Sequence, residues 1–334
     1  MSGIFSFLSY FTLSLRNNTN AGSIYANGRN EVEVVVNFIA CDDNGEQIFL
    51  EDYQISHNLS LCDYYTGEPI ENDGWYNGNG SGEFISDGIL LSSQSASLTA
   101  ALMPNNIHAL SMEPMEGFLL PQSFVMRVSV RNNVFAAKSI AAIFSNEAGL
   151  VYETTARSKF ESCVVLTPVA EKTYTTEDMT LCEGADHDVQ SGQKTNATGK
   201  WDTSKYNQYY LFTNNQLFIK KFLINKAVNQ DDDVVIRSIY TPAEDQYSSH
   251  STQILVDSML GEFVTAIGPD GNATYAKNER SGQLCLTRVD GNNVSTVNNL
   301  RQSVVVTLYD QYGNKGNFTI TTSNNLAARI EITD

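Results

Sequence analysis

Carboxylate and imidazole side chains gather at three places in this sequence where they could hold a metal ion. Asp186-His187-Asp188 is the densest group, while Glu71–Gly74 and Asp231–Asp233 carry the oxygen ligands that Ca²⁺ prefers. None of them has the twelve-residue ligand spacing of an EF-hand, and the first lies in a polar stretch typical of a solvated loop. We therefore expect ordinary turns and loops there, with no metal and no cofactor.

Catalytic motifs are missing from the sequence. It contains no Gly-x-x-x-x-Gly-Lys-Ser/Thr phosphate loop, no Gly-x-Ser-x-Gly elbow, no His-Glu-x-x-His and no Cys-x-x-Cys. The histidines lie in unlike contexts, at His57, His108, His187 and His250. Paired carboxylates for glycoside hydrolysis meet only in space, so one sequence cannot display them. We expect no enzyme, with a hydrolase on a β-scaffold as the third hypothesis.

A Gly- and Asn-rich segment over residues 74–82 places two aromatic residues side by side. Aromatic rings stack on sugar rings, and Asn side chains can hydrogen-bond to sugar hydroxyls. The candidate ligand-binding residues are Trp75, Tyr76, Asn77 and Asn79. The other interpretation is a hairpin whose Trp75 folds back to cover a sheet, in which case the segment has a structural role.

The N-terminal segment alternates apolar residues with Ser and Thr, which predicts a strand with one apolar face. The residues that share its apolar parity are Phe5, Phe7, Phe11, Leu13 and Leu15. This strand either belongs to its own domain or, on the tether Asn17–Gly22, pairs with the edge of a neighbouring subunit. The second interpretation makes these five residues candidates for assembly.

These candidate residues are expected to lie on strands and in the turns between them. Runs of β-branched and aromatic residues with a period of two or a continuous apolar stretch occur at 31–40, 124–130, 304–308 and 318–322, and Asp-Gly or Asn-Gly turn signals separate such runs. Short helices are possible over 95–103 and around 253–260. We predict an all-β fold made of sandwich domains, because βαβ units would need longer helical segments.

The stretch from Val304 to Ile320 consists of a strand, the turn Asp310-Gln-Tyr-Gly-Asn314 and a second strand. This unit resembles the repeated immunoglobulin-like modules of bacterial surface proteins and phage fibres. The resemblance implies tandem β-sandwiches with a scaffolding or adhesive role, and it carries over no catalytic residue.

Four pairs of similar segments follow one another in the same order at a nearly constant separation, which predicts a tandem duplication. The pairs are 24–28 with 211–215, 61–67 with 236–242, 120–128 with 300–308, and 139–146 with 317–324. The predicted organisation is an N-terminal arm over 1–22, a first β-sandwich over 23–170, a linker or long exposed loop over 171–203, and a second β-sandwich over 204–334.

Acidic residues outnumber basic ones, 38 to 21, so the net charge is −17 at pH 7. This charge argues against nucleic-acid partners and against docking on anionic membranes. The apolar stretch at 4–15 is too short to span a bilayer and lacks the flanks of a signal peptide. We expect synthesis in the cytoplasm without a cleavable leader and action in a released particle or outside the cell. The odd number of cysteines, five, indicates buried thiols and no complete disulfide framework.

These features predict a non-enzymatic structural subunit of a larger particle or filament, such as a phage virion or tailocin, that associates with itself or with other subunits through strands and sheet surfaces. The alternative is a carbohydrate- or receptor-binding protein, such as an adhesin, a lectin-like module or a toxin component.

Overall fold

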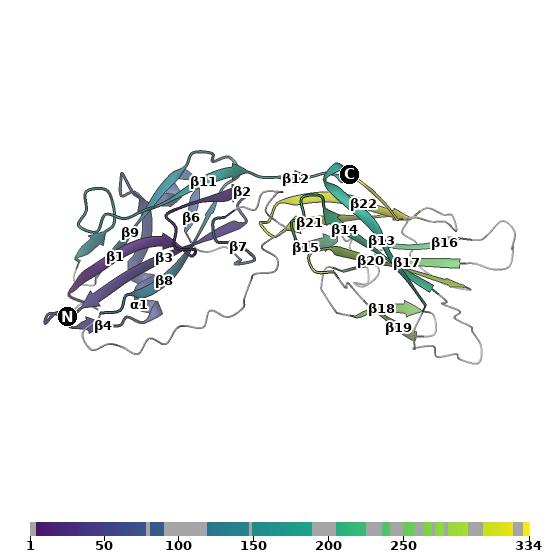
Figure 1. Ribbon diagram of the computed structural model, residues 1–334, viewed down its shortest axis with the longest axis horizontal. Helices are drawn as coiled ribbons and strands as arrows, with labels where there is room; N and C mark the ends of the chain where they lie inside the picture. The colour runs from purple at the N-terminus through teal and green to yellow at the C-terminus, as the bar shows by residue number, and fades with distance from the viewer. Residues whose placement is uncertain are drawn as a thin grey trace. The chain divides into compact units, whose positions relative to one another are not determined.

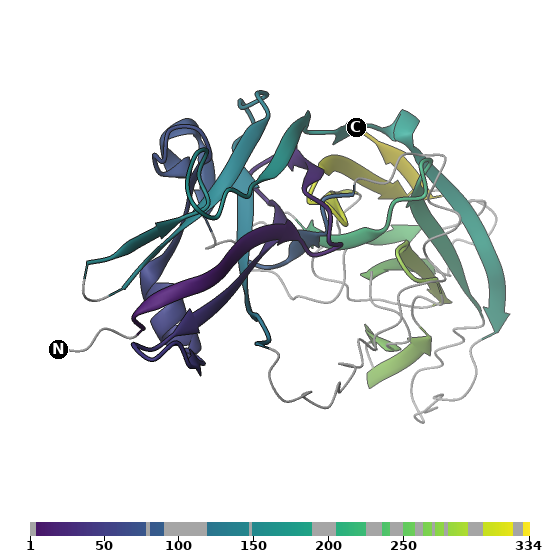
Figure 2. The ribbon, with the colours of Figure 1, turned by 60° about the vertical axis from the view of Figure 1, so that its left-hand side comes forward.

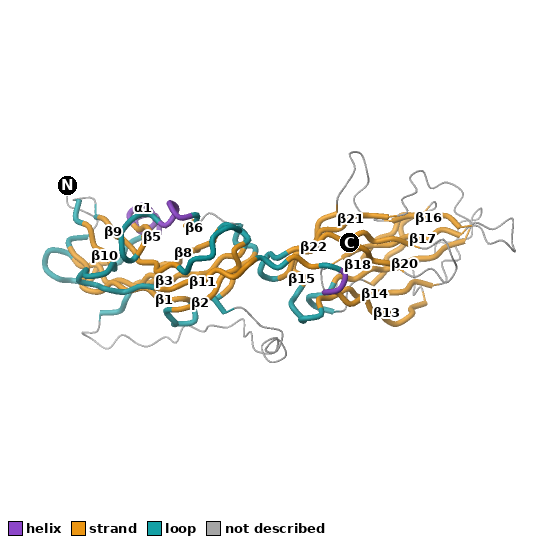
Figure 3. Tube along the Cα trace, turned by 90° about the horizontal axis from the view of Figure 1, so that it is seen from above, coloured by secondary structure: helices purple, strands orange, loops and turns teal. Residues whose placement is uncertain are grey.

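The computed structural model describes residues 5–77, 81–89, 119–146, 149–188, 205–224, 236–240, 250–257, 263–268, 271–276, 280–292, 303–322 and 330–334. The chain divides into two compact units, with the change from the first to the second between Glu171 and Lys172. Strands make up nearly all of the described elements in both units (Figures 1 and 3). The predicted all-β class is therefore confirmed.

The first unit consists of two sheets. One has the strand order β1-β3-β8-β6, with β4 and β7 also paired to β3. Its strands are β1 (Phe7–Leu15), β3 (Asn30–Cys41), β4 (Gln47–Ile48), β6 (Trp75–Asn77), β7 (Phe84–Ser86) and β8 (Gln122–Val130). The other has the order β10-β9-β11-β2, with β5 paired to β9. Its strands are β2 (Ala21–Ala26), β5 (Leu59–Asp63), β9 (Lys138–Ser145), β10 (Val151–Glu153) and β11 (Val164–Ala170). The helix α1 (Asp52–Asn58) and the 3₁₀ turn η1 (Ile70–Asp73) connect strands of this unit.

The second unit has two larger sheets and a separate hairpin. One sheet has the order β12-β22-β21-β15, with β23 paired to β22, and the other has the order β13-β14-β20-β17-β16. The first of these contains β12 (Thr173–Tyr174), β15 (Ile219–Ile224), β21 (Ser303–Asp310), β22 (Lys315–Thr322) and β23 (Ile330–Thr333). The second contains β13 (Met179–Asp188), β14 (Lys205–Thr213), β16 (Ile236–Tyr240), β17 (His250–Asp257) and β20 (Leu284–Asn292). The hairpin is β18 (Phe263–Gly268) with β19 (Gly271–Ala276), and η2 (Thr176–Asp178) precedes β13.

The two units share a frame of six strands that follow one another in the same chain order. In the first unit these are β2, β3, β5, β8, β9 and β11, and in the second they are β12, β14, β15, β20, β21 and β22. Within each frame the initial strand pairs in parallel with the last one, and the remaining pairs are antiparallel. In the first unit, the sheets β1-β3-β8-β6 and β2-β11-β9-β5 have the strand order of the immunoglobulin sandwich.

The segments that look repeated in the sequence are not equivalent in this frame. The match of 120–128 with 300–308 sets β8 against β21, whereas the frame makes β9 the counterpart of β21. The match of 24–28 with 211–215 likewise sets β2 against β14, although β14 occupies the place of β3. Alternating Val, Thr and Ser occur in most strands of a sandwich, so segments one strand out of step still look alike. The tandem arrangement is right, and the predicted register of the repeat is wrong.

Two predicted boundaries also need correction. Residues 1–22 are not a separate arm, because β1 pairs along its length with β3 inside the first unit (Figure 2). The segment 171–203 is not simply a linker either. Its residues 173–188 form β12, η2 and β13, and β13 pairs with β14 over Met179–Asp188. The second unit therefore begins at Lys172 and not at residue 204.

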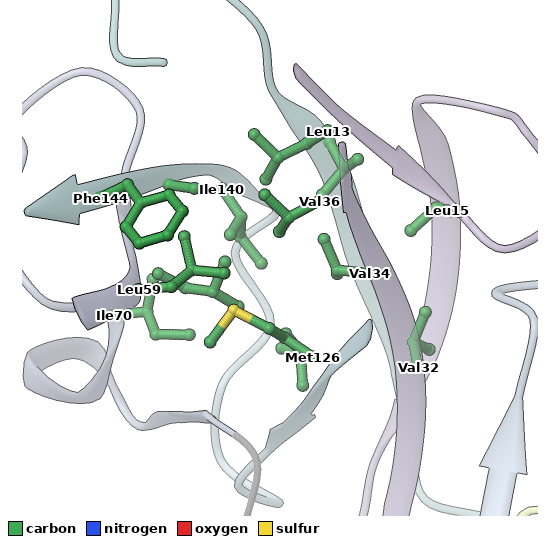
Figure 4. Packing of buried hydrophobic residues seen from close by; sticks show 14 of the residues in the cluster. Leu13, Leu15, Val32, Val34, Val36, Leu59, Ile70, Met126, Ile140 and Phe144 are labelled. Carbon is green, nitrogen blue, oxygen red and sulfur yellow. The ribbon is translucent and has the colours of Figure 1, made fainter. Parts of the chain in front are cut away.

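The core of the first unit lies between its two sheets. Leu13 from β1 and Val36 from β3 lie beside Ile140 and Phe144 from β9, and Met126 from β8 and Leu15 from β1 belong to the same core (Figure 4). The Phe144 ring makes edge contacts with Phe38 at 5.1 Å and with Phe5 at 5.2 Å between centroids. Fully burying each of these side chains stabilises the fold by about 1.5–3 kcal/mol. A second core, which includes Leu211, Leu286, Val306 and Phe318, lies between the sheets of the second unit.

The possible helix at 253–260 is wrong for its described part, because β17 runs to Asp257 and pairs with both β16 and β20. Pairing on both sides outweighs a weak local preference for helix. The possible helix at 95–103 lies outside the described residues. The structure has instead a short helix at α1, with a capping box between Glu51 and Gln54.

The hairpin turns follow their sequence signals. In Asp42–Glu46, the Asp42 carboxylate accepts the amides of Asn44 and Glu46 at 2.9 Å each, and Gly45 adopts φ 84°. In Asp310–Asn314, the Asp310 carboxylate accepts the amides of Tyr312 and Asn314 at 2.8 and 2.9 Å, and Gly313 adopts φ 77°. Both turns need a short acceptor at the first position and glycine at the left-handed one.

Candidate functional site

Trp75 is the first residue of β6, and it is 1% exposed in the core of the first unit. The preceding Gly74 ends η1 with φ 81°, and β6 then pairs with β8, where Trp75 lies opposite Val130. A buried ring cannot stack on a sugar. The prediction of Trp75 as a ligand-binding residue is therefore corrected, and the alternative in which it covers a sheet is the one that the structure has.

Tyr76 and Asn77, the other described residues of the predicted ligand loop, follow Trp75 in β6. Tyr76 points outward beside Ser129, and the Arg131 guanidinium lies over its ring at 4.9 Å from the centroid. The same guanidinium donates a hydrogen bond to the Tyr76 hydroxyl. Asn77 is half-buried opposite Val128, and Asn79 lies outside the described residues. One face of the Tyr76 ring is thus occupied by Arg131.

The predicted assembly residues divide between the core and the surface. Phe5, Phe11, Leu13 and Leu15 are buried, whereas Phe7 is 37% exposed. A bulge between Leu8 and Tyr10 shifts the register of β1 against β3 and places Leu8 in the core in place of Phe7. The apolar side of β1 therefore packs within its own unit, which corrects the prediction that these residues pair with a neighbouring subunit.

The predicted metal candidates have other roles where the structure describes them. Asp73, from the Glu71–Gly74 turn, forms an ion pair with Lys138, and residues 186–188 form the end of β13. Asp231–Asp233 lies outside the described residues. Within the part of the chain that is described, no three His, Cys, Asp or Glu side chains are grouped so that they could hold a metal ion. In the same part, no helix is long and apolar enough to cross a membrane.

Lys138 is a buried charge that sequence patterns did not reveal. Its ammonium group lies 2.8 Å from the Asp63 carboxylate and also pairs with Asp73. Burial acts to lower the pKa of Lys138, but the bonds to these two carboxylates outweigh it and raise the pKa above its usual value. Burial acts to raise the pKa of Asp63, and the bonds from Lys138 and from the amides of Thr66 and Tyr65 bring it below its usual value. The cluster ties β5, η1 and β9 together.

The cysteines form no disulfide, since all five thiols are free. Cys41, Cys62 and Cys285 are buried, while Cys163 and Cys182 are partly exposed. Burial, with the charges of Glu153 and Asp63, raises the pKa of Cys62 to about 12. A thiol with so high a pKa is a poor nucleophile at neutral pH, which agrees with a packing role.

The surface that stands out is the outer side of the strands β1, β3 and β8, which we call the β3 face. Strand register places its residues in rows, with Tyr10 opposite Ile39 and Phe7 opposite Cys41 at one end. The middle row consists of Thr12 from β1, Asn37 from β3 and Ser123 from β8. The next row consists of Ser14, Val35 and Val125 from the same three strands. The Ser123 hydroxyl donates to Asn37 Oδ1 at 2.6 Å, which fixes the middle row across β3 and β8.

Part of the β3 face is apolar. Ile39 and Cys41 point away from the core, yet they are only 7% and 1% exposed. The residues directly opposite them are Tyr10 and Phe7, which are 38% and 37% exposed and are placed to cover them. Val125 adds a further side chain that is 46% exposed. The outer side of this sheet therefore carries partly exposed apolar groups at two places, at Phe7 with Tyr10 and, beyond the polar row of Thr12, Asn37 and Ser123, at Val125.

Charges lie at the far end of the β3 face. Glu33 forms ion pairs with Arg16 and, at 3.6 Å, with Arg127, and Glu31 lies 4.0 Å from the same Arg127. Both glutamates are almost completely buried, although they alternate along β3 with the core residues Val32 and Val34 and so lie on its outward side. Between the Glu33 row and the turn Asp42–Glu46, the described outward residues of β1, β3 and β8 are all uncharged.

No protein-family model and no curated protein matches this chain. Solved structures that match include the C-terminal domain of the AgI/II polypeptide BspA of Streptococcus agalactiae, at 10% identity over 92% of this chain and 97% of that chain, with a TM-score of 0.21. They also include the C-terminal domain of the antigen I/II-family protein AspA of Streptococcus pyogenes, at 10% identity over 93% of this chain and 98% of that chain, with a TM-score of 0.21. At this TM-score the likeness to β-rich domains of bacterial antigens carries no conclusion about function.

Proposed function

We propose that this chain is a non-enzymatic structural subunit of a larger particle or filament and that it joins its neighbours through the β3 face. The observation that carries the proposal is the pair of exposed side chains Phe7 and Tyr10, which lie opposite the covered residues Cys41 and Ile39, with the exposed Val125 two rows further along the same face. Large apolar side chains exposed together on one face of a domain mark surfaces that bind other proteins.

Charge supports association at this surface. With a net charge of −17, two copies of the chain repel each other when they approach at random. The β3 face is uncharged from the Thr12 row to Phe7, and the carboxylates of Glu31 and Glu33 at its far end lie beside Arg127. A contact over this face brings few carboxylates against one another.

The particle or filament that we infer from the sequence is a phage virion, a tailocin or a comparable bacterial assembly. Tandem β-sandwiches suit the scaffolding role that the resemblance to modules of phage fibres and bacterial surface proteins implies, and we propose that the chain acts in a released particle or outside the cell. A glycan-binding adhesin was the alternative, but Trp75, the residue that best suited stacking on sugars, is buried. No described feature favours the alternative over assembly.

Sedimentation velocity over a range of protein concentrations tests the proposal, using a matched pair of substitutions. Val125→Glu puts a carboxylate on the β3 face, and Val169→Glu puts one at a residue of β11 that is 37% exposed. We expect the natural chain and Val169→Glu to form the same oligomers, and Val125→Glu to need at least a tenfold higher concentration. A natural chain that stays monomeric throughout, or an equal effect of the two substitutions, would show that the proposal is wrong.

A further inference from the structure

Four large apolar side chains are exposed where α1 begins and where the chain enters β8, and we call them the α1 patch. They are Phe49, Tyr53, Leu119 and Leu120, which are 70%, 71%, 48% and 51% exposed. The capping box between Glu51 and Gln54 fixes the first turn of α1, and Tyr53 lies in that turn. A group of large apolar side chains left open to solvent marks a surface for a partner.

Hydrogen bonds hold the two segments of the α1 patch together. The Gln47 side chain donates to the Leu120 carbonyl at 2.6 Å. Three residues further on, the Leu50 amide donates to the Gln122 side chain at 3.0 Å, and that side chain donates back to the Leu50 carbonyl at 2.5 Å. Phe49 lies between these two points of attachment, so its ring is held in the neighbourhood of Leu120. The patch is therefore built by tertiary contacts between segments that are far apart in the chain.

The rim of the α1 patch is acidic. Glu46 directly precedes β4, and Glu51 and Asp52 lie at the start of α1. All three are exposed, and none of the ion pairs among the described residues involves them. The sequence contains no Lys or Arg between Arg29 and Arg127, so the segments that carry the patch contribute no basic side chain. Negative charge thus lies beside exposed aromatic rings.

Aromatic rings beside carboxylates suit arginine and lysine side chains. A guanidinium or ammonium group is attracted to the face of an aromatic ring such as that of Tyr53 or Phe49. The same cation can pair with a neighbouring carboxylate such as Asp52, while its aliphatic stem covers apolar surface. The first unit already contains a contact of this kind, since the Arg131 guanidinium lies over the Tyr76 ring at 4.9 Å from the centroid. An acidic partner or an anionic membrane would instead be repelled.

We infer that the α1 patch binds a segment of a partner protein in which arginine or lysine side chains alternate with apolar ones. The basic side chains of that segment lie over Phe49 and Tyr53 beside the carboxylates, and its apolar side chains pack on Leu119 and Leu120. A second copy of this chain suits the patch less well, because its net charge of −17 is repelled by the acidic rim. The inference goes beyond the proposed function, since it concerns other residues and a partner other than this chain.

Three short peptides with blocked ends test the inference. The first combines Arg with Leu, the second has Glu in place of every Arg, and the third has Ser in place of every Leu. We expect the natural chain to bind the first about tenfold more tightly than either of the others, as measured by fluorescence anisotropy of labelled peptides. Its binding should also weaken as salt is added. Equal binding of the first and third peptides would show attraction to negative charge alone, and the inference would be wrong.

Matched substitutions locate the peptide on the chain. Phe49→Ala with Tyr53→Ala removes both rings of the α1 patch, whereas Phe135→Ala removes a ring that is 63% exposed between β8 and β9. We expect the first variant to bind the Arg–Leu peptide about tenfold more weakly and the second to change its affinity by less than about twofold. Glu46→Gln with Asp52→Asn should weaken binding at low salt and reduce its salt dependence. An equal effect of the two aromatic variants would place the peptide elsewhere and contradict the inference.

Two further measurements separate this inference from the proposed function. Val125→Glu, which changes the β3 face, should bind the Arg–Leu peptide as the natural chain does. In sedimentation velocity, Phe49→Ala with Tyr53→Ala should form the same oligomers as the natural chain. Circular dichroism checks that each variant is folded, and the single substitutions replace the double one if it is not.

The outcomes distinguish the two ideas. If the substitutions in the α1 patch abolish self-association and the peptide does not bind, the occupant is a second copy and the inference is wrong. If the natural chain stays monomeric but binds the peptide through the α1 patch, the proposed function fails and the inference stands.

Discussion

Trp75 and Tyr76 are neighbours in the sequence, but they lie in different environments. The indole is part of the core between the two sheets, while the phenol points outward and stacks with Arg131. Successive residues of a strand point to opposite sides, so one member of an adjacent aromatic pair had to face inward. Which of the two did so depended on how β6 pairs with β8.

Alanine substitutions of Trp75 and Tyr76 should differ in their effect on stability. We expect Trp75→Ala to lower the free energy of unfolding of the first unit by about 3–5 kcal/mol, because it removes a large buried side chain. Tyr76→Ala removes mainly the cation–π contact with Arg131 and should cost about 0.5–1 kcal/mol. Urea denaturation followed by circular dichroism measures both values. A larger effect of Tyr76→Ala would contradict the burial of Trp75.

Asp63 and Asp73 share the ammonium group of Lys138 but differ in exposure, since their side chains are 16% and 63% exposed. The pKa of Asp63 is lower in the folded chain than its usual value. A carboxyl group of this kind stabilises the fold above its unfolded pKa of about 3.9, and that contribution is lost as the pH falls through the lower folded pKa.

Asp63→Asn should therefore destabilise the first unit by about 1.5–3 kcal/mol at neutral pH, where a hydrogen bond between charged groups is lost. The difference from the natural chain should shrink as the pH falls below about 4, because a protonated Asp and an Asn are both neutral. Asp73→Asn is the control, and since Asp73 is exposed we expect a change within about 1 kcal/mol. Urea denaturation at several pH values measures the differences. A difference for Asp63→Asn that persists at low pH would contradict the assigned role of its charge.

At the scale of elements, β1 shows how a single irregularity decides which side chains are buried. The bulge between Leu8 and Tyr10 lets Phe11, Leu13 and Leu15 keep one parity while Leu8 replaces Phe7 in the core. The hydrogen-bonded ladder with β3 imposes this shift, and the alternation of residues in β1 gives no sign of it. The side chain left outside, Phe7, then becomes part of the β3 face.

Leu8→Ala and Phe7→Ala test the bulge as a matched pair. The first should lower the free energy of unfolding by about 2–5 kcal/mol, as expected for a fully buried leucine. The second should lower it by less than the first, because Phe7 is 37% exposed and only part of its ring is removed from water. Thermal and urea unfolding of the two variants provide the comparison. If Phe7→Ala is the more harmful change, β1 is in the unshifted register.

At the scale of the whole molecule, each unit has its own pair of sheets and its own core. The second unit needs the strands β12 and β13, which precede residue 204. Tyr174 of β12 is buried, and its hydroxyl donates to the buried Asp310 carboxylate at 2.8 Å. Met179 and Leu181 of β13 pack against the same core.

We therefore expect a chain of residues 172–334 to fold and a chain of residues 204–334 to fail. The shorter chain loses β13, one of the two strands that pair with β14, and leaves Asp310 buried without the Tyr174 hydroxyl, which costs free energy. The dispersion of amide signals in two-dimensional NMR spectra distinguishes a folded chain from an unfolded one. Well-dispersed spectra from both chains would place the boundary at residue 204.

Much of the fold class could be predicted from local patterns. The apolar run over 31–40, the turn signal Asp43-Asn44-Gly45 and the turn Asp310–Asn314 predicted strands and hairpins that the structure contains. These features depend on backbone preferences and on hydrogen bonds within a few residues, so they can be read from short segments. The repeat register failed because similar strand sequences occur throughout each sandwich.

Two tandem β-sandwiches and a strong negative charge could be predicted from the residues alone, since periodicity, turn residues and composition are local or additive properties. Which residues lie at the surface depended on the packing of the strands. Pairing between β6 and β8 buried Trp75, the β1 bulge exposed Phe7, and the approach of β5 and η1 to β9 gave Lys138 its two carboxylates. Exposure depends on which strands become neighbours, and that choice is made by contacts between residues far apart in the chain.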